Sequence, residues 1–222
     1  SGDYSVAMGQ DCSAGGIASF ADGSGCTAVG DYSVAMGYGC IASGNHSVAM
    51  GIGTKADASG SVAMGMGCTA DVSGSVAMGF LCSAGGISSF AMGANNAASG
   101  NASVAIGQLN KAEGNYSVAM GLRSDASGDY SVAMGRDCSA GGIASIAMGD
   151  NTDASGNHSV MLGFASLITT PFESPGYAGG DYSFSVGRNN IAGGAGSVAM
   201  GGCCFEDPAA NPPSRCEALG DG

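Results

Sequence analysis

Apolar and small residues recur along this chain with a period of 14 residues. The motif Ser-Val-Ala-Met-Gly, or a close variant, returns at this interval and then twice more after one longer step. A period this strict indicates one short unit that stacks on itself along an axis. Positions are numbered from the serine of each unit, so that position 1 is Ser and position 5 is Gly throughout. The units start at Ser5, Ser19, Ser33, Ser47, Ser61, Ser75, Ser89, Ser103, Ser117, Ser131, Ser145, Ser159, Ser183 and Ser197.

The alternation inside each unit predicts two strands joined by two turns. Alternate residues of a strand share a face. We therefore expect positions 2 and 4, mostly Val and Met, to point into an apolar interior, and positions 1 and 3, Ser and Ala, to form a smooth outer face. After Gly at position 5 the chain turns, and positions 8 and 10 share the inner face of a second strand. Two recurrent glycines per unit exclude a helix.

A second glycine, usually at position 12, is expected to supply the second turn, because Gly adopts positive φ without steric cost. In two units this glycine stands at position 14 instead, as Gly60 and Gly74. Stacked coils should lie about 4.8 Å apart. The sequence thus predicts an all-β solenoid of 14-residue coils over residues 1–201, with an insertion at about 164–182 and a Cys- and Pro-rich cap or linker at 202–222.

The composition limits the classes of partner and function to be expected for this chain. The formal net charge of −12 argues against binding to nucleic acid or to anionic membranes. No run of 18 apolar residues is present, so we expect no membrane span in this chain. Two histidines, no nucleophile motif, no phosphate-binding loop and no paired carboxylates predict a protein that is not an enzyme and that uses no cofactor. Because the chain starts inside a unit, we expect a mature product or a fragment of something longer.

Cysteine occupies position 8 in seven units, on the inner face with the Ala of position 10. One interpretation is a small buried apolar residue. Another is a disulfide between adjacent coils, whose Cα spacing lies within the disulfide range. In the tail, a small disulfide loop or end-to-end links between subunits are the alternatives. A metal site is disfavoured, because a column of single thiols without a nearby His offers no tetrahedral ligand set. The candidate disulfide residues are Cys12, Cys26, Cys40, Cys68, Cys82, Cys203, Cys204 and Cys216.

Aromatic residues recur at position 14, usually after Asp or Asn. This stripe at an outer turn is either a contact surface or a simple cover for the edge of the coil. The insertion is either a binding loop on a rigid scaffold or a neutral addition. The candidate binding residues are Tyr32, His46, Tyr116, Tyr130, His158, Phe172, Tyr177 and Tyr182.

The units SVAMGYGCIASG (33–44) and SVAIGQLNKAEG (103–114) resemble the YadA-like head of trimeric autotransporter adhesins. The resemblance implies a left-handed parallel β-roll, assembled as a homotrimer at the tip of an extracellular fibre. In that family the head binds host matrix proteins or cell-surface receptors. Similar repeats occur in phage and viral fibres, so the expected location is a cell surface or a virion surface.

Two functional hypotheses follow. The first is a non-enzymatic adhesin or receptor-binding head. The alternative is a structural subunit of an extracellular or viral fibre, assembled end to end through its cysteines. A weaker argument for the trimer comes from the coil itself, because 14 residues enclose little apolar area to offset the entropy of ordering so many glycines.

Overall fold

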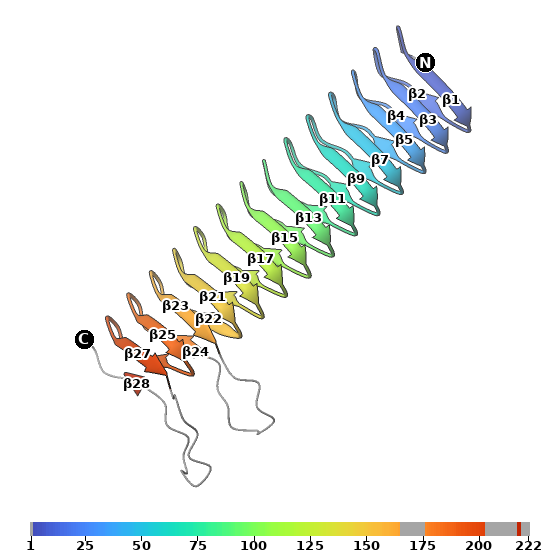
Figure 1. Ribbon diagram of the computed structural model, residues 1–222. Coiled ribbons are helices and arrows are strands. Elements are labelled where there is room, and N and C mark those ends of the chain that lie inside the picture. Colours follow the sequence, from blue (N-terminus) through green and yellow to red (C-terminus); the bar gives the residue numbers. More distant parts are fainter. Residues whose placement is uncertain (1, 165–175, 203–216, 219–222) are drawn as a thin grey trace, which may run out of the picture. The chain divides into compact units, whose positions relative to one another are not determined.

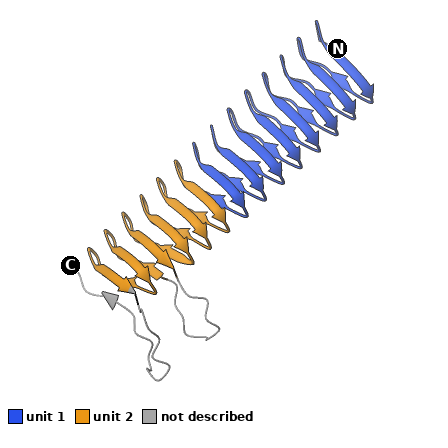
Figure 2. Ribbon diagram, in the orientation of Figure 1, with its two compact units in different colours: residues 1–112 blue, residues 113–222 orange. Residues whose placement is uncertain are grey.

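The computed structural model describes residues 2–164, 176–202 and 217–218, and all the regular structure in these residues is β (Figure 1). The chain divides into two compact units, residues 1–112 and residues 113–222 (Figure 2). In each unit a five-residue strand alternates with a strand of two or three residues. Long strands pair only with long strands, and short strands pair only with short ones. Each coil thus contributes one strand to each of two sheets.

The first unit contains eight coils. Its long strands are β1 (Val6–Gln10), β3 (Phe20–Ser24), β5 (Val34–Tyr38), β7 (Val48–Ile52), β9 (Val62–Met66), β11 (Val76–Phe80), β13 (Phe90–Ala94) and β15 (Val104–Gln108). Its short strands are β2 (Ser13–Ala14), β4 (Thr27–Ala28), β6 (Ile41–Ala42), β8 (Lys55–Ala56), β10 (Thr69–Ala70), β12 (Ser83–Ala84), β14 (Ala97–Ala98) and β16 (Lys111–Ala112).

The second unit repeats this arrangement. Its long strands are β17 (Val118–Leu122), β19 (Val132–Arg136), β21 (Ile146–Asp150), β23 (Val160–Phe164), β25 (Phe184–Arg188) and β27 (Val198–Gly202). Its short strands are β18 (Asp125–Ala126), β20 (Ser139–Ala140), β22 (Thr152–Ala154), β24 (Gly176–Ala178), β26 (Ile191–Ala192) and β28 (Glu217–Ala218).

Strand pairing is parallel and keeps the period of the sequence. Val34 lies opposite Val48 and Ala35 opposite Ala49, one unit apart. Identical positions of successive units therefore stack into columns. A residue at any position is flanked by the residues at the same position of the neighbouring coils. The predicted parallel β-solenoid of 14-residue coils is confirmed.

The direction of the long strands contradicts the sequence expectation. The Ala of position 3 is completely buried in nearly every coil, as at Ala35, Ala77 and Ala133, and the Ser of position 1 is buried with it. Val and Met at positions 2 and 4 point outward and are only half-buried. The coil is too narrow to hold a Val and a Met, so the smallest side chains fill the interior. The prediction that Val and Met line the interior was wrong.

The interior is completed by positions 8 and 10, as predicted. The Ala of position 10 is 0 % exposed in most coils, and the described cysteines and asparagines of position 8 other than Cys12 are at most 1 % exposed. Asn96 shows what a position-8 side chain does. Its amide nitrogen donates to the carbonyls of Met92 and Gly107 at 2.8 and 2.7 Å, and its amide oxygen accepts from the backbone N–H of Asn110 at 2.9 Å. The side chain therefore ties both strands of its own coil to the next coil.

Cysteine makes the same inward contacts with a thiol. The Sγ atom of Cys40 lies 3.2 Å from the carbonyl oxygen of Met36 and 3.1 Å from that of Gly51. We therefore expect Asn96→Cys to cost less than about 1 kcal/mol, whereas Asn96→Ala should cost about 2–4 kcal/mol because it leaves buried backbone groups without partners. Urea unfolding of both variants measures the difference. Equal loss in the two variants would contradict this role for position 8.

The two recurrent glycines serve different purposes. At position 5 the backbone has φ between 92° and 135° in the described coils where it is positive, and a Cβ at Gly51 would overlap the carbonyl oxygen of Gly65. At position 12, Gly30 does not have positive φ, but a Cβ there would overlap the carbonyl oxygen of Gly44. The expectation that position 12 supplies the positive φ of the second turn was therefore wrong. Close approach of consecutive coils, rather than φ, disfavours a side chain at Gly30, and Ala58 and Val72 take position 12 in the two coils whose position 14 is Gly60 or Gly74.

Position 14 takes the positive φ of the second turn. Gly60 and Gly74 have φ of 67° there, and non-glycine residues such as Tyr32 and His46 have φ of 57° and 59°. Each of these residues donates its backbone N–H to the previous coil, as Tyr32 does to Ile17 at 2.8 Å. The repeated hydrogen bond holds the left-handed conformation in side chains that ordinarily avoid it.

Part of the insertion and most of the tail lie outside the described residues, including Phe172, Cys203, Cys204 and Cys216. Tyr177 is described and belongs to β24, where it pairs with Asp153 and Ile191. It therefore occupies an ordinary strand position. Glu217 and Ala218 form β28 beside β26.

Candidate functional surfaces

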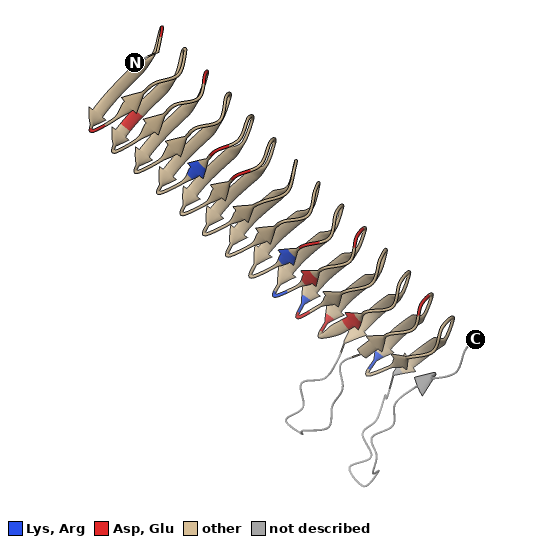
Figure 3. Cartoon of the chain, turned by 180° about the vertical axis from the view of Figure 1, so that it is seen from behind, with Lys and Arg blue, Asp and Glu red and all other residues tan. Residues whose placement is uncertain are grey.

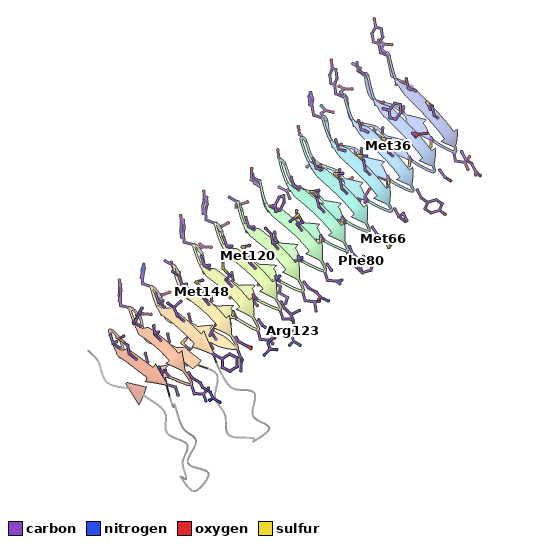
Figure 4. All side chains as sticks on the ribbon, viewed as in Figure 1. Met36, Met66, Phe80, Met120, Arg123 and Met148 are labelled. Atoms are coloured by element: carbon purple, nitrogen blue, oxygen red, sulfur yellow. The ribbon has the colours of Figure 1, made fainter. Side chains whose placement is uncertain are left out.

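Side chains at positions 2 and 4 cover the outside of the long strands with apolar groups. We call this surface the apolar face. In the first unit it runs from Val34 and Met36 to Val104 and Ile106, and in the second from Val118 and Met120 to Val198 and Met200. Met36, Met120 and Met148 are labelled on it in Figure 4. These side chains are partly exposed in the single chain, with Met92 and Met148 exposed by 39 % and 37 %.

Charge is almost absent from the apolar face. Among the described long strands, Asp22 is the single charged residue at positions 2 and 4. The described Lys and Arg residues lie on the short strands, at the ends of the long strands or, for Arg123, in the turn that follows a long strand (Figure 3). In the first unit, an exposed apolar row at position 6 adjoins the face, formed by Tyr38, Ile52, Met66 and Phe80. A continuous apolar surface of this kind is typical of a protein interface.

The second surface is the outer turn, positions 11–14 of each coil. Aromatic side chains at position 14 stack in pairs on adjacent coils. Tyr32 and His46 have ring centroids 5.2 Å apart, as do Tyr116 and Tyr130, and His158 and Tyr182 are 4.9 Å apart. The planes of these pairs lie within 12° of parallel. The sequence identified the row, and the structure adds that its members form stacked pairs.

Asp and Asn at position 13 fix the shape of this turn. Oδ1 of Asp31 accepts the backbone N–H of Ile17 at 2.8 Å, and Oδ1 of Asn157 accepts that of Ile143 at 2.9 Å. The turn is therefore a rigid hydrogen-bonded edge. It places rings from successive coils in register.

The cysteines of position 8 are free thiols in the part of the chain that the structure describes. They are Cys12, Cys26, Cys40, Cys68, Cys82 and Cys138. Burial raises the pKa of Cys26 and of Cys68, and backbone hydrogen bonds from Cys40 and Cys82, respectively, offset part of that rise. Cross-coil disulfides such as Cys12–Cys26 or Cys68–Cys82 remain a prediction.

Thiol reactivity should follow burial. Cys12 lies in the first coil and is partly exposed, whereas Cys40 is completely buried. We expect iodoacetamide at pH 8 to alkylate Cys12 at least about 100-fold faster than Cys40, because a buried thiol reacts only after local opening. Peptide mapping by mass spectrometry measures both rates in one sample. In guanidinium chloride the rates should become equal, and equal rates without denaturant would contradict the buried column.

No group of three or more His, Cys, Asp or Glu side chains within residues 2–164, 176–202 and 217–218 is arranged to hold a metal ion. Over the same residues, the structure contains no helix of the length and apolarity needed to cross a bilayer.

The comparison with protein families identifies the family to which the chain belongs. The model of the YadA head domain repeat matches residues 42–67, 84–110, 111–137, 140–164 and 178–202. The chain belongs to the YadA head family. In trimeric autotransporters, this family mediates adhesion. No curated protein sequence matches the chain.

Every match to the YadA head repeat includes part of the apolar face and residues of the outer turn. Sequence reasoning found the residues of both surfaces but placed Val and Met inside. The signal that would have corrected this is the size of position 3, which is Ala in nearly every unit. A column of alanines suits the narrow space between the two sheets of the solenoid.

Proposed function

We propose that this chain is a non-enzymatic adhesive head that assembles as a homotrimer on a cell or virion surface and binds host matrix proteins or a cell-surface receptor. Membership of the YadA head family supports the proposal. The observation that carries it is the apolar face, because its Val and Met side chains are only half-buried in a single chain. Covering an apolar side chain fully is worth about 1.5–3 kcal/mol relative to leaving it exposed.

A trimer in which the apolar faces meet gives the chain the core that its narrow coil lacks. The hydrogen-bonded outer turns and the short strands then remain available to a partner. Repetition of the same surface on many coils and three chains favours multivalent binding, in which weak contacts add to a strong attachment.

Adhesion is tested with beads that carry the purified chain. We expect these beads to stay on a surface coated with extracellular-matrix proteins under flow and to wash off an albumin-coated surface. Equal retention on both surfaces would contradict the adhesive function. Long polymers that fall apart in reductant would instead favour the structural fibre subunit, joined through cysteines.

A further inference from the structure

The row of rings at position 14 contains two gaps of one ring each. In the second unit, Ala144 lies between Tyr130 and His158, and in the first, Ala18 lies between Tyr4 and Tyr32. The backbone is the same at all three positions of each gap. In the second unit φ is 60°, 54° and 55° along the chain, and in the first it is 59°, 51° and 57°.

Hydrogen bonds hold these coils in register across both gaps. Ala144 donates its N–H to Asp129 at 2.8 Å, and His158 donates to Ile143 at 2.7 Å. Ala18 and Tyr32 make the same bonds, to Asp3 and Ile17, at 2.8 Å. An aromatic ring in place of Ala144 or Ala18 would therefore project alongside the rings at position 14 of the two adjacent coils. Alanine leaves that place empty.

The width of each gap suits one planar ring. Rings on adjacent coils stack with centroids 4.9–5.2 Å apart. Two strand spacings are about 9.5 Å, so a ring placed midway would lie about one stacking distance from each wall. Exposed Ile143 and Ile17, 52 % and 46 % exposed, precede the two alanines and add apolar surface. We call each gap a ring slot.

Of the four rings that form the walls of the slots, Tyr130, His158 and Tyr32 each stack on a further ring. Tyr130 stacks on Tyr116 with an interplanar angle of 4°, and His158 stacks on Tyr182 at 7°. In the first unit, Tyr32 stacks on His46 at 12°. A braced ring loses little side-chain freedom when a partner group enters, which lowers the entropic cost of binding.

Charge around the slots has one sign. No Lys or Arg occurs at positions 11–14 of any coil, and the acidic residues there appear red on the outer turns of Figure 3. They are Asp3, Asp31, Asp57, Asp71, Glu113, Asp129 and Asp181. A basic segment would be attracted to such an edge, more strongly at low salt.

The geometry points to the two ring slots as binding sites for aromatic side chains from a basic segment of a partner protein. Each slot completes its ring stack with one ring from the partner, and the acidic turns attract the Lys or Arg residues beside that ring. The inference rests on the proposed function for the kind of partner, a foreign protein. The slots themselves depend only on the outer turn.

The test uses the absence of tryptophan from the chain. The probe is the peptide Lys-Trp-Lys with blocked ends, whose indole fluorescence and anisotropy are followed as the protein is added at low salt. We expect saturable binding to the wild-type chain. Ala144→Tyr should halve the bound signal, and Ala18→Tyr with Ala144→Tyr should reduce it at least tenfold, because each new ring fills a slot from within.

Ala102→Tyr is the matched control, because it is the same Ala-to-Tyr change in the same turn, with φ of 51°. Its neighbours at position 14 are Ser88 and Tyr116, so the new ring neither fills a slot between two rings nor creates one. Binding to this variant should equal that of the wild type. Undiminished binding to the double variant, or no saturable binding to the wild type, would overturn the inference.

The peptide Glu-Trp-Glu separates the ring from the charge. We expect it to bind at least tenfold more weakly than Lys-Trp-Lys, and equal binding would overturn the assignment of a basic partner. Light scattering on the same variants keeps this test distinct from the proposed function. If the wild-type chain is a trimer but binds no peptide, only the ring slots are rejected. If light scattering shows a monomer, the trimeric head is rejected.

Discussion

Gly51→Ala should unfold or strongly destabilise the chain, by at least about 4 kcal/mol. Gly51 has φ of 124°, a conformation that costs a residue with a Cβ about 1–3 kcal/mol. The Cβ would also overlap the carbonyl oxygen of Gly65 on the next coil, which is backbone and cannot move aside without breaking the pairing of β7 with β9. Circular dichroism with urea unfolding measures the loss.

Gly53→Ala is the control, two residues away in the same turn. Gly53 has φ of 60°, and a Cβ there meets nothing within 4 Å. Leu81 and Arg123 occupy the equivalent position with φ of 50° and 54°. We expect this variant to lose no more than about 1 kcal/mol. Similar losses at the two positions would show that the close approach of consecutive coils does not select glycine at position 5.

Four acidic substitutions on the apolar face should cause the trimer to dissociate into monomers. We choose Met36→Asp, Met64→Asp, Met120→Asp and Met148→Asp, which lie on alternate coils of each unit. Met36, Met120 and Met148 are labelled in Figure 4. In a trimer built on this face, each would bury carboxylates without partners, at a cost of several kcal/mol per charge. We expect assembly to weaken at least about 1000-fold. More than one substitution is needed, because Asp22 shows that the face tolerates a single acid.

The control places four acids on the outside of the short strands, as Ser13→Asp, Ile41→Asp, Thr69→Asp and Ala97→Asp. These residues occupy position 9, where Asp125 and Asp153 occur naturally. The change in net charge is the same, and we expect the native mass to stay that of the wild type. Light scattering compares the two variants, and circular dichroism shows that both keep their β-structure. An equal effect in both would mean that charge alone, rather than the apolar face, controls assembly.

Much of this architecture follows from the sequence, because the period is strict. Ser at position 1 and Gly at position 5 mark every coil, and in-register stacking of a repeated unit fixes which residues become neighbours. The inward position of the cysteines also follows from alternation with the Ala of position 10. The stripe of rings at the outer turn could likewise be read from Tyr32, His46 and their equivalents.

The inside and outside of the long strand could not be assigned from alternation alone. Alternation separates Val34 and Met36 from Ser33 and Ala35 but does not say which pair is buried. The usual rule places the larger apolar residues inside, and it fails here because the space between the two sheets is narrow and is filled by Ala and Ser at positions 1 and 3 of most coils. The role of the second glycine was missed for a related reason. Contacts between consecutive coils, as at Gly30 and Gly44, are invisible in a single unit.

The native mass of the purified chain tests the central claim most directly. Light scattering, with and without reductant, should give three times the 21.2 kDa of one chain in both conditions. Assembly through the apolar face needs no disulfide, so reductant should not change the value. A monomer at micromolar concentration would contradict the assembly of this face, and long polymers that dissociate in reductant would contradict the trimeric head.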